Sequence, residues 1–169
     1  MRFLKVILVV LGVVTVGFFV TGIATPKEFH AQLSVSLPAS KIRVWNMLTD
    51  IKHLPERRKD VTKIEMLGLN SKENPYWKEY AGKDQFMVFE MANQEYPNRM
   101  VINMTESTFG MTGSWTYQLD GNDSITNLTV TEDSKIQSYI TRSILTMTSR
   151  AHFLKREVIS IKKTIAEGK

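Results

Sequence analysis

Six consecutive stretches of the chain alternate apolar and polar residues, and only short turns separate them. This succession constrains the fold more than any other feature, because a period of two is typical of β-strands. The six predicted strands are residues 61–69, 76–81, 85–95, 99–107, 111–119 and 124–132. Residues 120–123, Asp-Gly-Asn-Asp, give the strongest hairpin signal. Because strands joined by short turns run antiparallel, the sequence predicts an antiparallel sheet.

The elements around these strands complete an α+β domain. Residues 29–37 alternate in the same way and form a first strand, which Pro38 ends. Ser40 is a suitable N-cap for a short helix up to Asp50, and a second short helix follows within residues 51–58. Apolar residues then recur every three or four positions over 136–167 without Gly or Pro, which predicts one helix of about 45 Å. Only this long C-terminal helix can fill the concave side of a curved seven-stranded sheet.

The first segment of the chain differs from the rest. Residues 6–24 carry no charge and would form a helix of about 29 Å, close to the hydrocarbon thickness of a bilayer. We therefore predict an N-terminal transmembrane anchor in residues 1–25, with 3–24 in the membrane, and a globular domain in 26–169. A cleavable signal peptide is the alternative, because Gly-Ile-Ala at 22–24 offers small residues for cleavage. The apolar run is longer than the roughly 7–15 residues of a usual signal-peptide core, which favours the anchor.

Positive charge predicts the orientation of this anchor. Arg2 and Lys5 favour a cytoplasmic N-terminus, although Lys27, Lys41 and Arg43 on the other side oppose it. We expect a single-pass membrane protein whose globular domain is extracytoplasmic.

Composition excludes several classes of site. The 169 residues include no cysteine, so disulfides, thiolate metal sites and cysteine nucleophiles are excluded. The three histidines stand far apart and match no metal-binding spacing. The net charge of +5 is not gathered into the dense basic stripe with interleaved aromatics that nucleic-acid binders carry. We expect no metal, no cofactor and no nucleic-acid partner.

Five short motifs lie at the predicted element boundaries. They are Leu-Pro-Ala-Ser at 37–40, Val-Trp-Asn-Met-Leu-Thr-Asp at 44–50, Val-Thr-Lys-Ile-Glu at 61–65, Gly-Ser-Trp-Thr-Tyr at 113–117 and Leu-Thr-Val-Thr-Glu at 128–132. Together they resemble the polyketide cyclase/dehydrase and lipid-transport family of the START-like, or helix-grip, superfamily, over about residues 29–166. The resemblance implies a hydrophobic cavity between the sheet and the long helix, usually for a lipid, sterol, polyketide or other apolar molecule. It implies no shared catalytic residues, and we assign none.

Such a cavity would take its walls from inward-facing apolar residues of irregular size. Methionine, of which the chain has nine, suits adaptable walls. The predicted cavity residues are Trp45, Leu48, Phe86, Met104, Trp115, Tyr117, Ile140, Ile144 and Met147. Four glutamates also fall in predicted strands, and the alternation places most of them on the outer face: Glu79, Glu90, Glu106 and Glu132. Any of them that faced the cavity would have a raised pKa and could act as an acid or base.

Three functions fit these features. The one we favour is a membrane-tethered domain that binds or transports a hydrophobic small molecule or lipid, driven by roughly 25 cal/mol per Å² of buried apolar surface. A cyclase/dehydratase-type enzyme that uses a buried carboxylate or Tyr117 is the second. A regulatory protein-binding module with a collapsed cavity is the third.

Overall fold

The antiparallel sheet predicted from the alternation is present. A computed structural model describes residues 2–149 and 151–168 of the chain. Its strands are β1 (Glu28–Leu37), β2 (Lys63–Leu69), β3 (Pro75–Tyr80), β4 (Phe86–Glu95), β5 (Arg99–Ser107), β6 (Met111–Gly121) and β7 (Thr126–Ile136). They form one sheet in the order β1-β7-β6-β5-β4-β3-β2, and each neighbouring pair is antiparallel. From β2 to β7, strands that follow one another in sequence are neighbours, as their short turns require.

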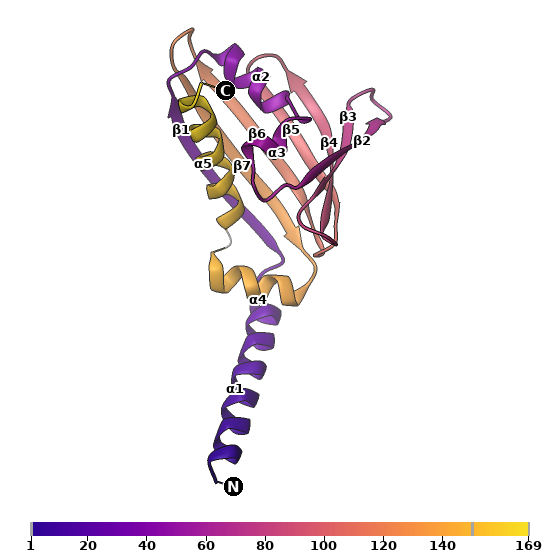
Figure 1. Cartoon of the computed structure of the whole chain (residues 1–169), viewed down its shortest axis with the longest axis vertical. Helices are drawn as coiled ribbons and strands as arrows, with labels where there is room; N and C mark the ends of the chain where they lie inside the picture. Colours follow the sequence, from indigo (N-terminus) through magenta and orange to yellow (C-terminus); the bar gives the residue numbers. More distant parts are fainter. Residues whose placement is uncertain (1, 150, 169) are drawn as a thin grey trace.

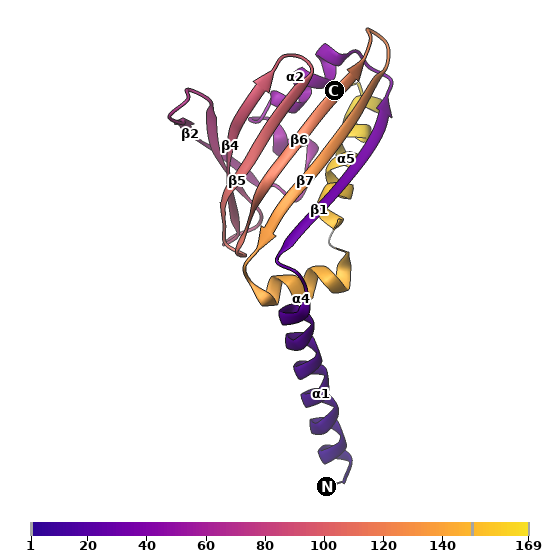
Figure 2. The ribbon, with the colours of Figure 1, turned by 180° about the vertical axis from the view of Figure 1, so that it is seen from behind.

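The sheet has one covered face and one open face. Along β7, every second residue from Thr126 to Ile136 is buried, and the alternate residues point to the other side. The helices α2 (Lys41–Thr49), α3 (Leu54–Arg57) and α5 (His152–Ala166) all lie on the covered face (Figure 1). Figure 2 shows the opposite face, over which no helix of the described chain passes. The core therefore lies between the sheet and these three helices.

Helix α2 begins where the sequence predicts. The hydroxyl of Ser40 accepts a hydrogen bond of 3.3 Å from the backbone N–H of Arg43 and caps the helix. Val44 and Leu48, on its inner side, are buried against the sheet, whereas Ile42 stays half exposed. The prediction of a first short helix with an N-cap at Ser40 is confirmed.

The C-terminal helical region differs from the prediction of one continuous helix over 136–167. Ile136 ends β7, and two helices follow, α4 (Tyr139–Thr148) and α5. The break lies at Ser149, whose φ of 101° is in the left-handed region and cannot continue a right-handed helix. Helix α5 is the long C-terminal helix that packs on β1 and β7, whereas α4 turns away and packs on α1.

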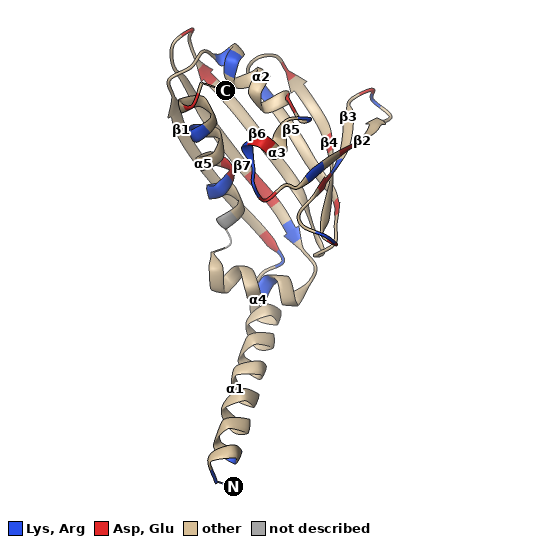
Figure 3. Ribbon diagram, viewed as in Figure 1, with Lys and Arg blue, Asp and Glu red and all other residues tan. Residues whose placement is uncertain are grey.

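Helix α1 (Arg2–Ala24) is the predicted apolar N-terminal helix. The most apolar 18-residue window of its 23 residues has a mean hydropathy of 2.7, and 6% of that window is buried. By length and composition the helix is able to cross a membrane. It projects away from the sheet (Figure 1), and Figure 3 shows charge only at its N-terminal end. The division of the chain into residues 1–25 and 26–169 stays a prediction.

Candidate functional site

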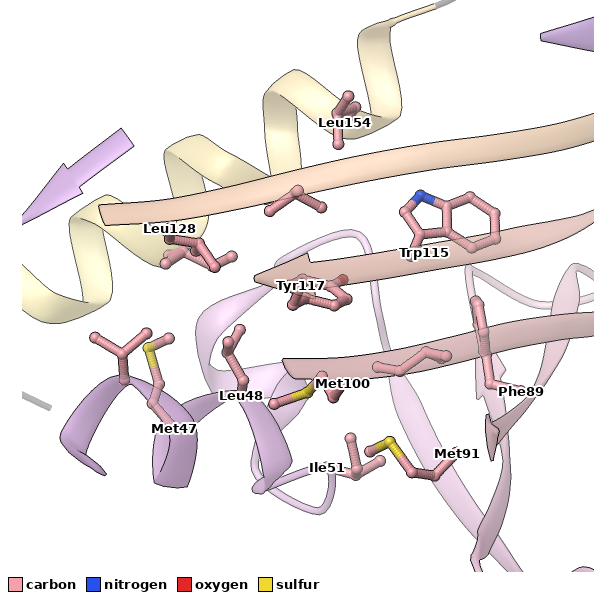
Figure 4. Close-up of a cluster of buried hydrophobic side chains, with 14 of the residues drawn as sticks. Met47, Leu48, Ile51, Phe89, Met91, Met100, Trp115, Tyr117, Leu128 and Leu154 are labelled. Atoms are coloured by element: carbon pink, nitrogen blue, oxygen red, sulfur yellow. The ribbon is translucent and has the colours of Figure 1, made fainter. Parts of the chain in front are cut away.

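A cavity of about 90 Å³ lies between the covered face of the sheet and the helices. Its walls come from α2, α3, α5 and strands β3 to β6, and they are mostly apolar. Figure 4 shows the side chains of Leu48, Ile51, Phe89, Trp115 and Tyr117 in the space between helix and sheet. The lining residues are Leu48, Ile51, Leu54, Arg57, Arg58, Trp77, Glu79, Met87, Phe89, Ile102, Met104, Phe109, Met111, Trp115, Tyr117, Phe153 and Glu157.

Four of the nine predicted cavity residues line this space. Leu48 reaches it from α2, Met104 from β5, and Trp115 and Tyr117 from β6. Trp115 and Tyr117 share a face because they stand two residues apart on one strand. The ring of Trp115 meets that of Phe89 edge-on at 6.2 Å between centroids. Whether these four residues bind a ligand stays a prediction.

Two predicted cavity residues lie elsewhere. Trp45 is buried, but it packs edge-on against Tyr96 at 5.5 Å and does not line the cavity. Phe86 lies on the outer side of β4, because its neighbour Met87 takes the inner side. The ammonium of Lys78 sits 3.8 Å from the centroid of the Phe86 ring. Both placements in the cavity wall are therefore wrong.

The remaining three predicted cavity residues belong to α4. Ile140 and Ile144 are 45% and 49% exposed, and Met147 is 74% exposed. They line no part of the cavity, because the break at Ser149 directs α4 away from the concave face. Only α5, through Phe153 and Glu157, contributes C-terminal residues to the wall.

One wall of the cavity carries the charged residues Arg58, Glu79 and Glu157. Together with Asp60, which lies behind this wall, they form what we call the Arg58 cluster. The Arg58 guanidinium lies 2.9 Å from Asp60, 3.3 Å from Glu157 and 3.6 Å from Glu79. Burial alone would lower the pKa of Arg58, but the three carboxylates outweigh it and raise that pKa. Arg58 therefore stays charged and ties the end of α3 to β3 and α5.

Glu79 is the most buried member of this cluster, with 3% of its surface exposed. Its Oε1 accepts a hydrogen bond of 3.0 Å from the indole Nε1 of Trp77. Its Oε2 is buried and has no hydrogen-bond partner in the described part of the chain, since Arg58 at 3.6 Å is too far. Burial raises the pKa of Glu79, and Arg58 and Trp77 offset only part of this effect. The cavity thus contains a carboxyl group with one unused oxygen.

Tyr117 places a hydroxyl near the same cluster. It donates a hydrogen bond of 3.4 Å to Oε1 of Glu157 on α5. Burial, reinforced by the Glu157 carboxylate, raises the pKa of Tyr117 well above its ordinary value. The phenol is therefore protonated at neutral pH, and its single O–H is directed at Glu157.

Alternation alone does not identify these charged groups as inward-facing. Glu79 and Glu132 are buried, whereas Glu90 is half-buried and Glu106 is exposed. Glu132 lies outside the cavity wall and accepts a hydrogen bond of 2.8 Å from Ser134. The available signal for Glu79 is its phase with Trp77, because a large apolar residue two positions away marks the inner face. The described residues contain no group of three or more His, Asp or Glu placed to hold a metal ion.

Several solved structures share this architecture. A START superfamily protein from Mycobacterium smegmatis aligns with a TM-score of 0.66 at 9% identity, over 83% of this chain and 99% of its own. The Zhui aromatase/cyclase from a Streptomyces species gives 0.70 at 11% identity, over 82% and 94%. Norcoclaurine synthase from Thalictrum flavum, in complex with dopamine and hydroxybenzaldehyde, gives 0.62 at 13% identity, over 89% and 92%.

No protein-family profile and no curated protein sequence matches the chain. At these identities the likeness to solved structures is one of fold, and it agrees with the fold that the sequence motifs imply. A curved seven-stranded antiparallel sheet, two short helices after its first strand and a long C-terminal helix give this chain the START-like, helix-grip fold.

Proposed function

We propose that this protein binds a small, largely apolar organic molecule in the cavity between the sheet and α5 while α1 holds it at a membrane. The observation that carries the proposal is an apolar cavity whose lining residues carry two buried atoms without a hydrogen-bond partner in the described chain, the acceptor Oε2 of Glu79 and the donor Nε of Arg57. Apolar walls supply affinity by desolvation, and a few polar groups orient the bound molecule. A hydroxyl group on the ligand suits Glu79, because a hydroxyl pairs with a carboxylate as donor and with a carboxylic acid as donor or acceptor.

The size of the cavity limits the ligand. Its 90 Å³ is smaller than the about 150 Å³ apolar cavity that holds benzene, and well below the roughly 300–1,000 Å³ of usual ligand pockets. A ligand of lipid size therefore requires the walls to move. Met87, Met104 and Met111 line the cavity, and methionine side chains change rotamer at low cost. The proposed ligand is a single-ring compound, which requires a small displacement of these methionines, or a larger one, which requires more.

Native mass spectrometry of the full chain, purified from cells in mild detergent, tests this proposal. Wild-type protein should release an organic-extractable molecule. Met111→Trp fills the cavity and should abolish retention, whereas Met66→Trp, at a site 40% exposed on β2, should not. The proposal would be contradicted if Met111→Trp still retained the ligand, or if the wild type were empty and also failed to bind phenol. Either result would favour the protein-binding alternative.

Membrane tethering is supported by contacts that the domain makes with α1. Arg142 of α4 is 5% exposed and donates a hydrogen bond of 2.7 Å to the carbonyl of Gly22. Ser143 is fully buried and donates one of 2.6 Å to the carbonyl of Phe18. Removal of α1 would take one hydrogen-bond acceptor from each of these groups, which has a cost of about 0.5–1.5 kcal/mol for each bond, while Arg142 keeps its bonds to Ile136 and Gln137 and Ser143 keeps its bond to Tyr139. These contacts favour a retained anchor over a cleaved signal peptide.

Intact-mass analysis of protein extracted from membranes tests retention directly. The proposed anchor predicts a mass that includes residues 1–25, and a cleaved product beginning near Pro26 would contradict it. Arg2 and Lys5 favour an extracytoplasmic domain, so protease added outside spheroplasts should digest the domain and leave the N-terminus protected.

An acid–base enzyme is a second candidate, favoured by the raised pKa of Glu79 beside the Tyr117 hydroxyl. Two of the solved structures of similar fold are named as an aromatase/cyclase and a synthase. This candidate predicts that Glu79→Gln abolishes turnover of a bound compound without loss of fold. Binding without turnover in the wild type would leave the carrier function alone.

A further inference from the structure

Helix α4 exposes an apolar face. Ile140, Ile144 and Met147 are 45%, 49% and 74% exposed. Their spacing of four and three residues places them on one side of the helix. Single apolar residues on a surface are ordinary, but three adjacent ones mark a contact surface. We call these three residues the α4 apolar face.

The opposite side of α4 rests on the domain. Leu145 is buried there, and the Arg142 guanidinium donates a hydrogen bond of 2.9 Å to the carbonyl of Ile136 at the end of β7. At about 100° per residue, Arg142 and Leu145 lie roughly 160° from the centre of the α4 apolar face. The apolar face therefore points away from the sheet.

A third side of α4 contacts the last two turns of α1. Ser143 bonds to the carbonyl of Phe18, and the hydroxyls of Thr146 and Thr25 lie 3.2 Å apart. The rings of Tyr139 and Phe19 lie 5.8 Å apart. Figure 1 shows α4 crossing the end of α1, between α1 and the sheet.

The length of α1 sets the level of α4. Its 23 residues span about 34 Å, slightly more than the roughly 30 Å of hydrocarbon. The end of a spanning α1 that contacts α4 would thus lie at the boundary between hydrocarbon and headgroups. Tyr139, which is 45% exposed, is of a type enriched at that level.

We infer that α4 lies in the membrane–water interface and that Ile140, Ile144 and Met147 contact lipid acyl chains, an inference that rests on the proposed anchoring by α1. The domain occupies one side of α4, and the bilayer occupies the other. In the described chain α4 carries Arg142 as its charged residue, and Arg142 is buried against the domain. No charge therefore has to be removed from the apolar face when it enters the interface.

This placement orients the cavity. The Thr141 hydroxyl of α4 donates a hydrogen bond of 2.8 Å to the carbonyl of Phe109. Phe109 lines the cavity and stacks on Phe153 at 6.5 Å between ring centroids. An α4 that lies on the bilayer would place the Phe109–Phe153 end of the cavity nearest to the lipid.

Fluorescence quenching in vesicles tests the inference. The chain has no cysteine, so single-cysteine variants of the full chain can each carry one bimane group. Ile144→Cys and Met147→Cys probe the α4 apolar face, Val10→Cys probes the middle of α1, and Ile159→Cys is the matched control. Ile159 is an isoleucine 65% exposed on α5. The proteins are reconstituted in mixed phosphatidylcholine and phosphatidylglycerol vesicles, and quenching by spin-labelled lipid is compared with quenching by aqueous iodide.

The expected result is strong lipid quenching at positions 10, 144 and 147, with iodide quenching severalfold weaker at 144 and 147 than at 159. Lipid quenching at 10 together with iodide quenching at 144 and 147 equal to that at 159 would overturn the inference and leave the anchor intact. Protection of 144 and 147 from both quenchers would place a second copy or a partner on this face, which also overturns it. Absence of lipid quenching at 10 would overturn the anchor and the inference together.

Discussion

The indole of Trp77 and the carboxyl of Glu79 face the cavity from the same side of β3, joined by a hydrogen bond of 3.0 Å from Nε1 to Oε1. Both residues are almost fully buried. The bond holds the carboxyl in one orientation and occupies one of its two oxygens. The other oxygen, Oε2, is left for a partner that the described residues do not supply. A buried acceptor without a partner is costly, so a ligand that satisfies it gains affinity.

Glu79→Gln should remove the preference for a hydroxyl-bearing ligand. Phenol and benzene differ by one hydroxyl group. Above the raised pKa of Glu79, where its carboxyl group is ionised, a hydrogen bond to this charged group contributes about 1.5–3 kcal/mol. We expect wild-type protein to bind phenol roughly 10- to 150-fold more tightly than benzene. In Glu79→Gln this ratio should fall towards one, because the amide cannot offer the same acceptor beside Arg58. Ligand-observed NMR on the full chain in nanodiscs measures both dissociation constants.

Glu90→Gln is the matched control for this measurement. Glu90 lies on the neighbouring strand β4, is half-buried, and accepts hydrogen bonds from Asn70 and Asn103 outside the cavity wall. The substitution Glu90→Gln should leave the ratio of the affinities for phenol and benzene unchanged. Equal ratios in the wild type and in Glu79→Gln would remove Glu79 from the binding site.

The raised pKa of Glu79 makes stability depend on pH. Above its ordinary value of 4.5, the folded chain holds this proton while the unfolded chain releases it. The folded state then binds more protons, so the free energy of unfolding falls as pH rises from about 4.5 through the raised pKa. Glu79→Gln lacks this titration. The apparent thermal midpoint of Glu79→Gln should therefore increase relative to that of the wild type as pH rises.

Asp60→Asn supplies a control of opposite sign. Burial alone would raise the pKa of Asp60, but the hydrogen bond and the positive charge of Arg58, together with the charge of Arg156, outweigh burial and lower it. The stability that Asp60 contributes is present above its ordinary pKa of 3.8 and is lost as pH falls below it. Between pH 5 and pH 8 the carboxyl group of Asp60 does not itself titrate, so the difference in stability between wild type and Asp60→Asn should change less than that for Glu79→Gln, and only because loss of the Asp60 charge lowers the pKa of Glu79. If the difference in stability between the wild type and Glu79→Gln stayed constant over the same pH range, the raised pKa of Glu79 would be contradicted.

The sheet and its register follow from local rules that a sequence displays. Alternation of apolar residues assigns one face of each strand, and turns such as that around Asn122 fix which strands pair. The Asn122 side chain accepts hydrogen bonds from the N–H groups of Ser124 and Ile125, and β6 pairs with β7 across this turn. For the same reason Trp115 and Tyr117 were correctly placed on the inner face.

The break between α4 and α5 and the inward orientation of Glu79 depend on tertiary contacts instead. Neither Gly nor Pro marks the position of Ser149, and the apolar period continues through it. What gives α4 its direction is the binding of Arg142 and Ser143 to α1. The phase of Glu79 with Trp77 indicates the inner face, but the pairing with Arg58, which approaches from another element, is not encoded in any local pattern.

Gly22→Ala should weaken the contact between α1 and α4. A Cβ atom at this position would lie 2.1 Å from the carbonyl oxygen of Tyr139, and backbone cannot move aside as a side chain can. Overpacking of this kind costs about 1–3 kcal/mol, so the apparent thermal midpoint of the full chain in detergent should fall by several degrees. Gly17→Ala is the matched control, because no atom lies within 4 Å of its Cβ position in the same helix. Equal midpoints for the two variants would indicate that α1 does not pack on α4 as described.

Met104→Ala should enlarge the cavity and change its ligand preference. Met104 lies on β5 beside Phe89 of β4 and Gly113 of β6, and Gly113 has no side chain to refill the space. Loss of a buried methionine side chain costs about 2–5 kcal/mol of stability, but the void would be continuous with the cavity. We expect naphthalene to bind more tightly to Met104→Ala than to the wild type, measured by ligand-observed NMR in nanodiscs.

Met100→Ala separates this effect from destabilisation. Met100 is fully buried on the same face of β5 but does not line the cavity, and Tyr117 is its partner on β6. Both variants should lose similar stability, because both leave a void where a methionine was buried. Only Met104→Ala should gain affinity for naphthalene, since only its void adds to the space that a ligand occupies. A gain in both, or in neither, would show that ligands do not bind between β5 and α5, and would contradict the binding function proposed for this cavity.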